Sequence, residues 1–372
     1  MIRELSKGRW EVVVYLGRHP ETGKKRNLSR VVHGSRSEAK RLEARLLLSR
    51  DEATPDAAGR SPMHTVLAAW LEHAAPGLSP STLTGYRGIV RRYLDPEIGE
   101  IPVGDLTPFR IDALYAALRA RGTLSSTTIH HVHAVLHRAL EQAVRWEWIE
   151  RNPATRVDPP AMAPSEISPP SIDQVRELLD RARTTDPELG TLLRLAVAIG
   201  ARRGELCGLR IDDVDVEAAT ITIRRSIVED SAGIAHEKTT KTKRPRVCRV
   251  DPGTVDAVRT HLTRTKKLAL ECGTKVDKAG FLFSEDPRRR SPMPPKVVSR
   301  RYRRLLAGLP FHVRLHDLRH WHVTTLIAAG VAVPQVGGRV GHASNRMTLD
   351  VYSHFQEAAD DRSAEVIGEL LG

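Results

Sequence analysis

A dense run of prolines divides this chain into parts. Residues 151–170 contain six of its 23 prolines. Proline fixes φ and lacks a backbone N–H, so such a run can form neither a long helix nor an inner strand of a sheet. We therefore expect an extended linker at residues 151–170, with separately folded domains on both sides. The length of 372 residues is enough for two or three domains.

Residues 1–57 are expected to form a small domain of three strands followed by one helix. The β-branched and aromatic residues at 10–16 predict a strand, and the Pro-Glu-Thr-Gly sequence at 20–23 predicts a turn. Ser35 and Glu38 have the spacing of a capping box, which predicts a helix that continues to about Ser49.

The next domain, residues 58–150, is expected to be entirely helical. A capping residue precedes a proline at Ser61, Ser79 and Thr107, an arrangement favoured where helices begin. Apolar residues recur with helical spacing in a fourth helix at about 126–148. Four helices of this kind predict a compact all-α domain.

Four histidines lie on the fourth helix, at positions 130, 131, 133 and 137. His133 and His137 are four residues apart, as two metal ligands on one helix would be. The sequence does not complete a ligand set around them. Histidines that face solvent or phosphate are therefore favoured over a metal site.

Residues 171–372 are expected to form an α-rich domain with a small antiparallel sheet. Helical and strand patterns alternate, and the chain is again mainly helical from Pro295 to its end. The expected helices span about 171–183, 188–210 and 252–271, and the expected strands span 219–227 and 245–250.

The charge of the chain favours a polyanionic partner. Its 58 Lys and Arg residues against 45 Asp and Glu give a net charge of +13. Residues 1–50 contain 13 basic and 5 acidic residues, and residues 151–372 contain 36 and 28, whereas residues 61–150 are nearly neutral. Because phosphate neutralisation supplies most sequence-independent affinity for DNA, the two ends of the chain are the candidates for DNA contact. The candidates in the first domain, for which the alternative is a solvated sheet edge, are Lys24, Lys25, Arg26 and Arg30.

The composition disfavours several other classes of protein. The three cysteines are scattered and form no C-x-x-C pair, which argues against a disulfide framework or a zinc ribbon. No apolar run approaches the roughly 20 residues of a membrane span. The first ten residues also lack the apolar core of a signal peptide. We therefore expect a cytoplasmic protein without a membrane partner.

A set of side chains suited to phosphoryl transfer occurs in the last domain. This reaction needs a nucleophile, cations for the non-bridging oxygens and an acid for the leaving oxygen. Glu205 lies three residues after the first arginine and can brace it, and a histidine and the second arginine share one helical face. The set consists of Arg202, Lys241, His316, Arg319, His342 and Tyr352.

These segments resemble the tyrosine recombinases, also called the phage integrase family. The order and spacing of the motifs agree from residue 171 to the end, and the residues before them resemble the arm-binding and core-binding domains of integrases. The motifs are A-x-G-A-R-R-G-E-L at 198–206, T-K-T at 240–242, H-x-L-R-H at 316–320, G-H-A-S at 341–344 and T-L-D-x-Y-S-H at 348–354.

The resemblance implies three domains and a mechanism. The domains would be an arm-type DNA-binding domain at 1–57, a helical core-binding domain at 58–150 and a catalytic domain at 171–372. Tyr352 would attack the scissile phosphate and form a 3′-phosphotyrosine. Arg202 and Arg319 would hold the non-bridging oxygens.

The remaining residues of the set would then assist. Lys241 would be the general acid, with Lys238 and Lys243 as alternatives. His316 would assist proton transfer, His342 would hydrogen-bond the phosphate, and Glu205 would orient the site. No metal ion or nucleotide cofactor is expected.

The resemblance also implies partners. They are double-stranded DNA at core and arm sites, a homotetramer that acts on two duplexes, and an excision factor or host DNA-bending protein. An integrase of a phage or mobile element is favoured over a Xer-type chromosome resolvase, because residues 1–57 form an additional domain.

Two alternatives stay open at the level of the sequence. A DNA-binding regulator or inactive paralogue would not need Lys241 and Tyr352. Residues 316–320 also read H-D-x-x-H, which is close to the H-E-x-x-H of zinc hydrolases, although Arg319 would place a positive charge beside the metal. The chain departs from the family pattern at residues 337–338, where two glycines fall within an expected helix, and at residues 321–322, where Trp and His replace smaller residues.

Overall fold

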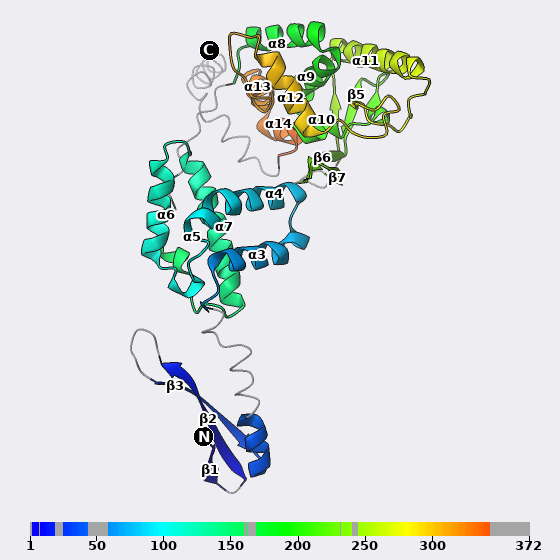
Figure 1. The fold of residues 1–372 in the computed structure, drawn as a ribbon. Coiled ribbons are helices and arrows are strands. Elements are labelled where there is room, and N and C mark those ends of the chain that lie inside the picture. Colours follow the sequence, from blue (N-terminus) through cyan, green and yellow to red (C-terminus); the bar gives the residue numbers. More distant parts are fainter. Residues whose placement is uncertain are drawn as a thin grey trace, which may run out of the picture. The chain divides into compact units, whose positions relative to one another are not determined.

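The computed structural model describes residues 2–6, 8–18, 25–43, 59–159, 161, 169–230, 232–239 and 245–342. They belong to two compact units, Met1–Pro164 and Ser165–Gly372, which divide within the proline-rich segment. Figure 1 shows that both units are rich in helices and that the sheets are small. No helix among these residues is long and apolar enough to cross a membrane.

The N-terminal part of the first unit is a β-β-β-α arrangement, as the sequence predicts. Three antiparallel strands lie in the order β1-β2-β3, and a helix follows through residues 36–43. The backbone N–H of Ser35 donates to Glu38 Oε2 (2.6 Å), and that of Glu38 donates to Ser35 Oγ (3.3 Å), which confirms the capping box. The strands are β1 (Ile2–Ser6), β2 (Arg9–Arg18) and β3 (Lys25–His33).

Strand β3 carries part of the predicted basic stretch. Arg30 is exposed on it. Lys24, the side chains of Lys25 and Arg26, and the expected end of the helix near Ser49 lie outside the described residues.

The helical part of the first unit surrounds an apolar core, and its helices begin where capping residues occur. Ser79, Thr107 and Ser125 each accept a hydrogen bond from the backbone N–H three residues later. Pro62 occupies the N-cap position itself, so the first helix begins one residue later than expected. The second helix continues through a π-helical turn into a short third one. The elements are α3 (Met63–Ala74), α4 (Pro80–Ile89), the turn Val90–Leu94, α5 (Asp95–Ile98), α6 (Pro108–Ala120) and α7 (Ser126–Arg145).

The first turn of the proline-rich segment packs against α7. Residues Pro153–Arg156 form a 3-10 helix, and Ala154 and Val157 are buried in the core of the helical part. The Asn152 amide donates to the main-chain oxygen of His137 (3.0 Å). Residues 152–157 therefore fold with the helical unit.

One histidine of α7, His133, has a structural partner. His133 Nδ1 lies 2.8 Å from the buried hydroxyl of Tyr115 on α6. No group of three or more His, Cys, Asp or Glu residues is placed to hold a metal ion within the described part of the chain. His133 thus satisfies a core tyrosine, and the sequence had favoured solvent or phosphate for it.

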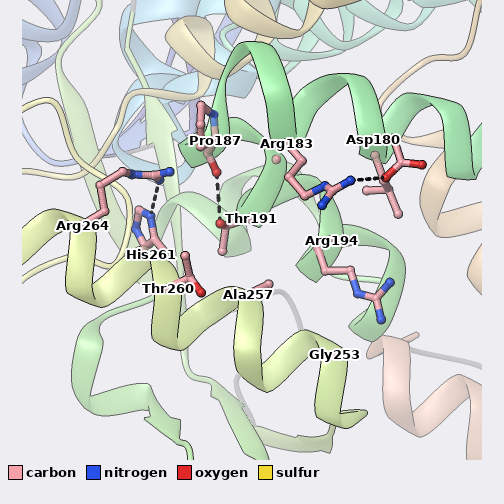
Figure 2. A pocket seen from close by; sticks show the side chains of 12 residues that line it. Asp180, Arg183, Pro187, Thr191, Arg194, Gly253, Ala257, Thr260, His261 and Arg264 are labelled. Atoms are coloured by element: carbon pink, nitrogen blue, oxygen red, sulfur yellow. Dashed lines mark hydrogen bonds and ion pairs between the residues drawn. The ribbon is translucent and has the colours of Figure 1, made fainter.

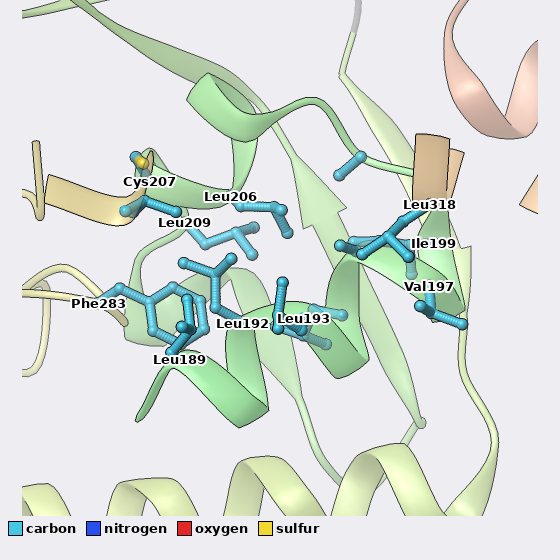
Figure 3. Packing of buried hydrophobic residues seen from close by; sticks show 14 of the residues in the cluster. Leu189, Leu192, Leu193, Val197, Ile199, Leu206, Cys207, Leu209, Phe283 and Leu318 are labelled. Carbon is cyan, nitrogen blue, oxygen red and sulfur yellow. The ribbon is translucent and has the colours of Figure 1, made fainter. Parts of the chain in front are cut away.

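The second unit packs helices around a leucine-rich helix, α9. Figure 3 shows Leu189, Leu192 and Leu193 of α9 facing Phe283 and Leu206, and all of these side chains are buried. The helices are α8 (Ile172–Thr185), α9 (Pro187–Ile199), α10 (Arg203–Cys207), α11 (Pro252–Glu271), α12 (Pro295–Leu306), α13 (Asp317–Ala328) and α14 (Val333–Val340). The strands are β4 (Val214–Asp215), β5 (Thr220–Ile223), β6 (Arg225–Glu229), β7 (Ala235–Thr239) and β8 (Arg246–Arg249).

Two expected elements are divided in the structure. The helix expected at 188–210 ends at Gly200, whose φ of 59° is left-handed, and a short second helix begins at Arg203. The strand expected at 219–227 is two strands: β5 pairs with β4 and β8, whereas β6 pairs with β7. β8 thus pairs with β5, whereas β7, which precedes β8 in the chain, belongs to a different sheet.

The two glycines at 337 and 338 do not prevent a helix. Both lie within α14, and Gly337 is buried. The helix ends at Gly341, whose left-handed φ of 68° is readily adopted by glycine. This end places His342 directly after the helix.

Candidate active site

Arg202 occupies the N-cap position of α10 and is held by the carboxylate of Glu205. Its backbone N–H donates to Glu205 Oε2 (2.8 Å), and its Nη1 donates to Glu205 Oε1 (3.1 Å). Its Nη2 donates to the main-chain oxygen of Gly341 (3.3 Å). The Glu205 side chain is only 2% exposed, whereas the Arg202 side chain is 26% exposed. The buried carboxylate therefore holds Arg202 in place while part of its guanidinium group stays accessible to solvent.

A third arginine, which the sequence did not single out, neutralises Glu205 from the other side. Arg246 on β8 donates Nη2 to Glu205 Oε2 (2.6 Å) and Nη1 to Glu205 Oε1 (3.2 Å). Burial acts to raise the pKa of the Glu205 carboxyl, but the hydrogen bonds and charge of Arg246 and Arg202 outweigh it and lower the pKa. Glu205 is therefore a buried carboxylate that orients two guanidinium groups.

Arg319 lies in the first turn of α13 and is 3% exposed. Its Nη1 donates to the main-chain oxygen of Gly200 (2.6 Å). Its Nη2 is buried and has no hydrogen-bond partner among the described residues. Burial, and then the charge of Arg202, lower the Arg319 pKa to about 9. An unsatisfied buried donor of this kind is costly, which makes it a strong candidate to bind an anion.

Three histidines lie near the two arginines. His316 and His320 are in edge-to-face contact, with ring centroids 4.8 Å apart. Desolvation is the main cause that lowers the pKa of His316 and of His342 to about 4, and the charges of Arg319 and Arg202 add to it in both. His316 is nevertheless an exposed side chain, so an approaching phosphate can reach its ring and favour protonation.

The structure thus brings together five of the residues singled out in the sequence, namely Arg202, Glu205, His316, Arg319 and His342. Lys241 and Tyr352 lie outside the described residues, as does the alternative acid Lys243. Lys238, the other alternative, lies on β7 opposite Ser226 of β6.

The site carries an excess of positive charge. Arg202, Arg246 and Arg319 contribute three guanidinium groups, and Glu205 is the one carboxylate that contacts them within the described part of the chain. Planar guanidinium forks suit the oxygens of a phosphodiester. The arrangement can therefore hold a phosphate and stabilise the charge that develops during its transfer.

Sequence comparison places this geometry in a family. The chain matches the phage integrase family over residues 171–359 and the phage integrase central domain over residues 63–159. The first of these matches covers half of the chain. The chain belongs to the phage integrase family. It is a tyrosine-type site-specific recombinase, an enzyme that cleaves and rejoins DNA.

Several individual proteins are similar to this chain over most of its length. A XerC-like tyrosine recombinase of Caldanaerobacter subterraneus subsp. tengcongensis is 25% identical over 83% of this chain and 82% of its own. The integrase of transposon Tn1549, solved with circular-intermediate DNA, is 19% identical and covers 82% of this chain and 99% of its own, with a TM-score of 0.69. A lambda integrase tetramer bound to a Holliday junction is 20% identical and covers 94% of both chains, with a TM-score of 0.56. The fold expected from the sequence is confirmed by these structures.

Within this integrase-family site, the sequence could have indicated Arg246. On β8 the side chains alternate, and the Arg246 and Cys248 side chains are the more buried ones of the strand, with exposures of 10% and 0%. An arginine on the buried face of a strand needs an internal acidic partner. The sequence alone, however, does not tell which face of a short strand is buried.

The described residues of this integrase site lie apart from a pocket elsewhere in the second unit. A pocket of about 340 Å³ lies between α8, α9 and α11, and Figure 2 shows Arg183, Arg194 and Arg264 around it. Arg183 is paired with Asp180 (3.1 Å). None of the residues predicted to be catalytic lines this pocket.

Proposed function

We propose that this recombinase cleaves DNA by attack of Tyr352 on a phosphodiester held by Arg202 and Arg319. The observation that carries the proposal is the convergence of these arginines, one with a buried and unsatisfied Nη2, beside two histidines. The tyrosine hydroxyl passes its proton to His316 as its oxygen bonds to phosphorus. The 5′ oxygen leaves with a proton from the general acid, for which we propose Lys241.

Rejoining reverses these steps. The 5′ hydroxyl of an incoming strand attacks the 3′-phosphotyrosine, and the tyrosine leaves with its proton restored. One phosphodiester is exchanged for another, so the energy of the bond is kept and no nucleotide is consumed. In this scheme His316 holds the tyrosine proton between the two steps, His342 hydrogen-bonds the phosphate, and Glu205 keeps Arg202 oriented.

Duplex DNA is the proposed substrate, and α12 offers a surface for it. The exposed residues Lys296, Arg300, Arg303 and Arg304 have the spacing of one helical face. Such a face can neutralise successive phosphates. We propose domains at 1–57, 58–150 and 171–372, with residues 152–157 packed on the second of them and the rest of the proline-rich segment joining it to the third. The first domain would bind arm-type sites through Arg30 and the neighbouring basic residues.

We further propose that four protomers act on two duplexes. Exchange of two duplexes requires four strand cleavages, and each cleavage uses one tyrosine. The lambda integrase structure, a tetramer on a Holliday junction, supports this stoichiometry. Similarity to a transposon and a phage integrase supports a role in a mobile element, for which an excision factor or host DNA-bending protein would set the direction.

A nicked suicide substrate tests the proposed chemistry. The wild-type chain should form a covalent adduct with core DNA, in the presence of excess EDTA as well, whereas Tyr352→Phe should bind the same DNA and form none. A covalent adduct with Tyr352→Phe would assign the nucleophile elsewhere. Loss of wild-type cleavage in EDTA, with recovery on adding a divalent metal, would support the H-D-x-x-H hydrolase alternative.

A further inference from the structure

Two polar residues behind the catalytic arginines are bonded to each other. His322 on α13 is 5% exposed, and its Nδ1 lies 2.8 Å from the main-chain oxygen of Val197. A carbonyl only accepts, so this nitrogen carries the proton. Nε2 is then an acceptor, and it receives a hydrogen bond from Arg339 Nε on α14 (3.3 Å).

Besides its bond to His322 of α13, Arg339 contacts the end of α9 and strand β8. Its Nη2 donates to the main-chain oxygens of Ala198 and Arg249, each at 2.9 Å. Its own main-chain oxygen accepts from Arg246 Nε (2.9 Å). One side chain therefore connects α14 to the end of α9, to β8 and to α13.

Three of the main-chain oxygens that accept these hydrogen bonds lie at the same helix end. Val197, Ala198 and Gly200 lie at the C-terminal end of α9, where main-chain oxygens have no partner within the helix. His322, Arg339 and Arg319 supply one donor to each of these oxygens. Cationic donors are also favoured there by the helix dipole.

These contacts close a ring that contains both phosphate-binding arginines. Arg319 bonds to Gly200, which lies two residues before Arg202. Arg202 bonds to the oxygen of Gly341, which lies two residues after Arg339. Arg339 returns to α13, the helix of Arg319, through His322.

The ring has little room to shift. A Cβ atom on Gly200 would lie 2.6 Å from His322 Cδ2 and 2.8 Å from Val340 Cγ1. Helices α13 and α14 therefore both press against the left-handed turn at Gly200. A change at either polar residue should move the arginines relative to each other instead of being absorbed nearby.

We propose that Arg339 and His322 are positioning residues that set the relative placement of Arg202 and Arg319 for phosphoryl transfer. This inference rests on the function proposed for the same site. Neither residue needs to touch DNA. Their loss should slow cleavage more than it weakens DNA binding, because the transition state is more sensitive to donor geometry than the bound duplex is.

The test measures single-turnover cleavage of a suicide substrate together with the dissociation constant for the same DNA. We expect Arg339→Met to cleave about 10–100-fold more slowly while its dissociation constant stays within about threefold of wild type. His322→Asn keeps a donor for Val197 but removes the acceptor for Arg339, and should show a smaller loss in the same direction. Arg339→Lys, which can keep one carbonyl contact, should recover part of the rate.

Three controls make the result decisive. Arg176→Met removes an exposed arginine of α8 and should cleave at the wild-type rate. The double variant of Arg339→Met and His322→Asn should fall no further than about twofold below the slower single variant, because both break one ring. Thermal unfolding identifies any variant that does not fold, in which case Arg339→Lys and His322→Asn decide.

Two results would overturn the inference: wild-type cleavage by Arg339→Met, or equal loss of binding and cleavage. If the wild-type chain forms no adduct at all, the proposed function fails instead. The two failures are thus distinguishable.

Discussion

At the scale of single residues, two buried histidines of the second unit are kept neutral by the same pair of hydrogen bonds, one to a main-chain oxygen and one from an arginine. His322 donates to the oxygen of Val197 and accepts from Arg339, and His261 on α11 lies 2.8 Å from the oxygen of Leu282 and accepts from Arg264 (3.0 Å). A carbonyl on one side and a guanidinium on the other leave no place for a second proton. Burial is the main cause that lowers the pKa of each histidine to about 4.

This arrangement predicts that acid destabilises the catalytic domain. The folded pKa of His261 lies below the value of 6.5 of a free histidine, so as the pH falls from 6.5 towards 4 the unfolded chain gains a proton that the folded one does not. Its stabilising contribution is complete above pH 6.5 and is lost in that window, by about 2 kcal/mol per histidine between pH 7 and pH 5. Urea unfolding at both pH values measures the loss.

Two variants isolate the contribution of one histidine. His261→Gln keeps a donor for Leu282 without a titrating group, so it should lose about 2 kcal/mol less than wild type between the two pH values. His131→Gln, at an exposed position of α7, should retain the wild-type loss. An unchanged pH dependence in His261→Gln would show that this histidine does not act in the proposed way.

At the scale of elements, β7 and β8 follow each other in the chain but belong to different sheets. β7 pairs with β6 alone among the described strands, while β8 pairs with β5 and presents Arg246 to Glu205. The proposed general acid therefore belongs to a segment that joins the small β6-β7 ribbon to the body of the domain.

We predict that Lys241→Ala lowers the cleavage rate by about 10²–10⁴-fold with an ordinary phosphodiester, because the 5′ oxygen then leaves without a proton. A substrate with sulfur at the 5′ bridging position should restore the rate, since a thiolate leaves without protonation. Lys238→Ala and Lys243→Ala serve as matched controls and should need no such rescue. If one of them shows the rescue and Lys241→Ala does not, the acid is that lysine.

At the scale of the whole molecule, the basic N-terminal residues and the arginine site lie in parts of the chain that have separate hydrophobic cores. The basic N-terminal residues accompany a separate three-stranded sheet with its own core of Val12, Val14 and Ala39. Arg202 and Arg319, the arginines proposed to hold the phosphate, belong to the second unit, whose core includes the leucines of α9. An N-terminal part with its own core can be removed without opening the core of the catalytic unit.

Deletion of residues 1–57 should therefore abolish high-affinity binding to arm-type sites and leave binding to core DNA nearly unchanged. Gel-shift titrations with separate arm and core duplexes measure both. Binding of the full chain should also weaken steeply with salt, as expected when many phosphates are neutralised. Equal loss of arm and core binding in the truncated chain would contradict an arm-binding role.

The sequence by itself determined where several helices begin and which residues are candidates for the site. Capping at Ser35, Ser79 and Thr107, and the apolar period of α7, are local signals, and the structure reproduces them. The motif spacing also singled out Arg202 and Arg319, which the structure places near each other.

Only the tertiary structure decided how these residues are held. The break at Gly200, the pairing of β8 with β5, the burial of His322 and the hydrogen bonds of Arg246 and Arg339 all depend on contacts between segments far apart in the chain. Arg339, for example, bonds to a carbonyl 141 residues away. Local patterns report propensity and periodicity, but a hydrogen bond to the free end of a distant helix forms only when packing has brought that end within reach.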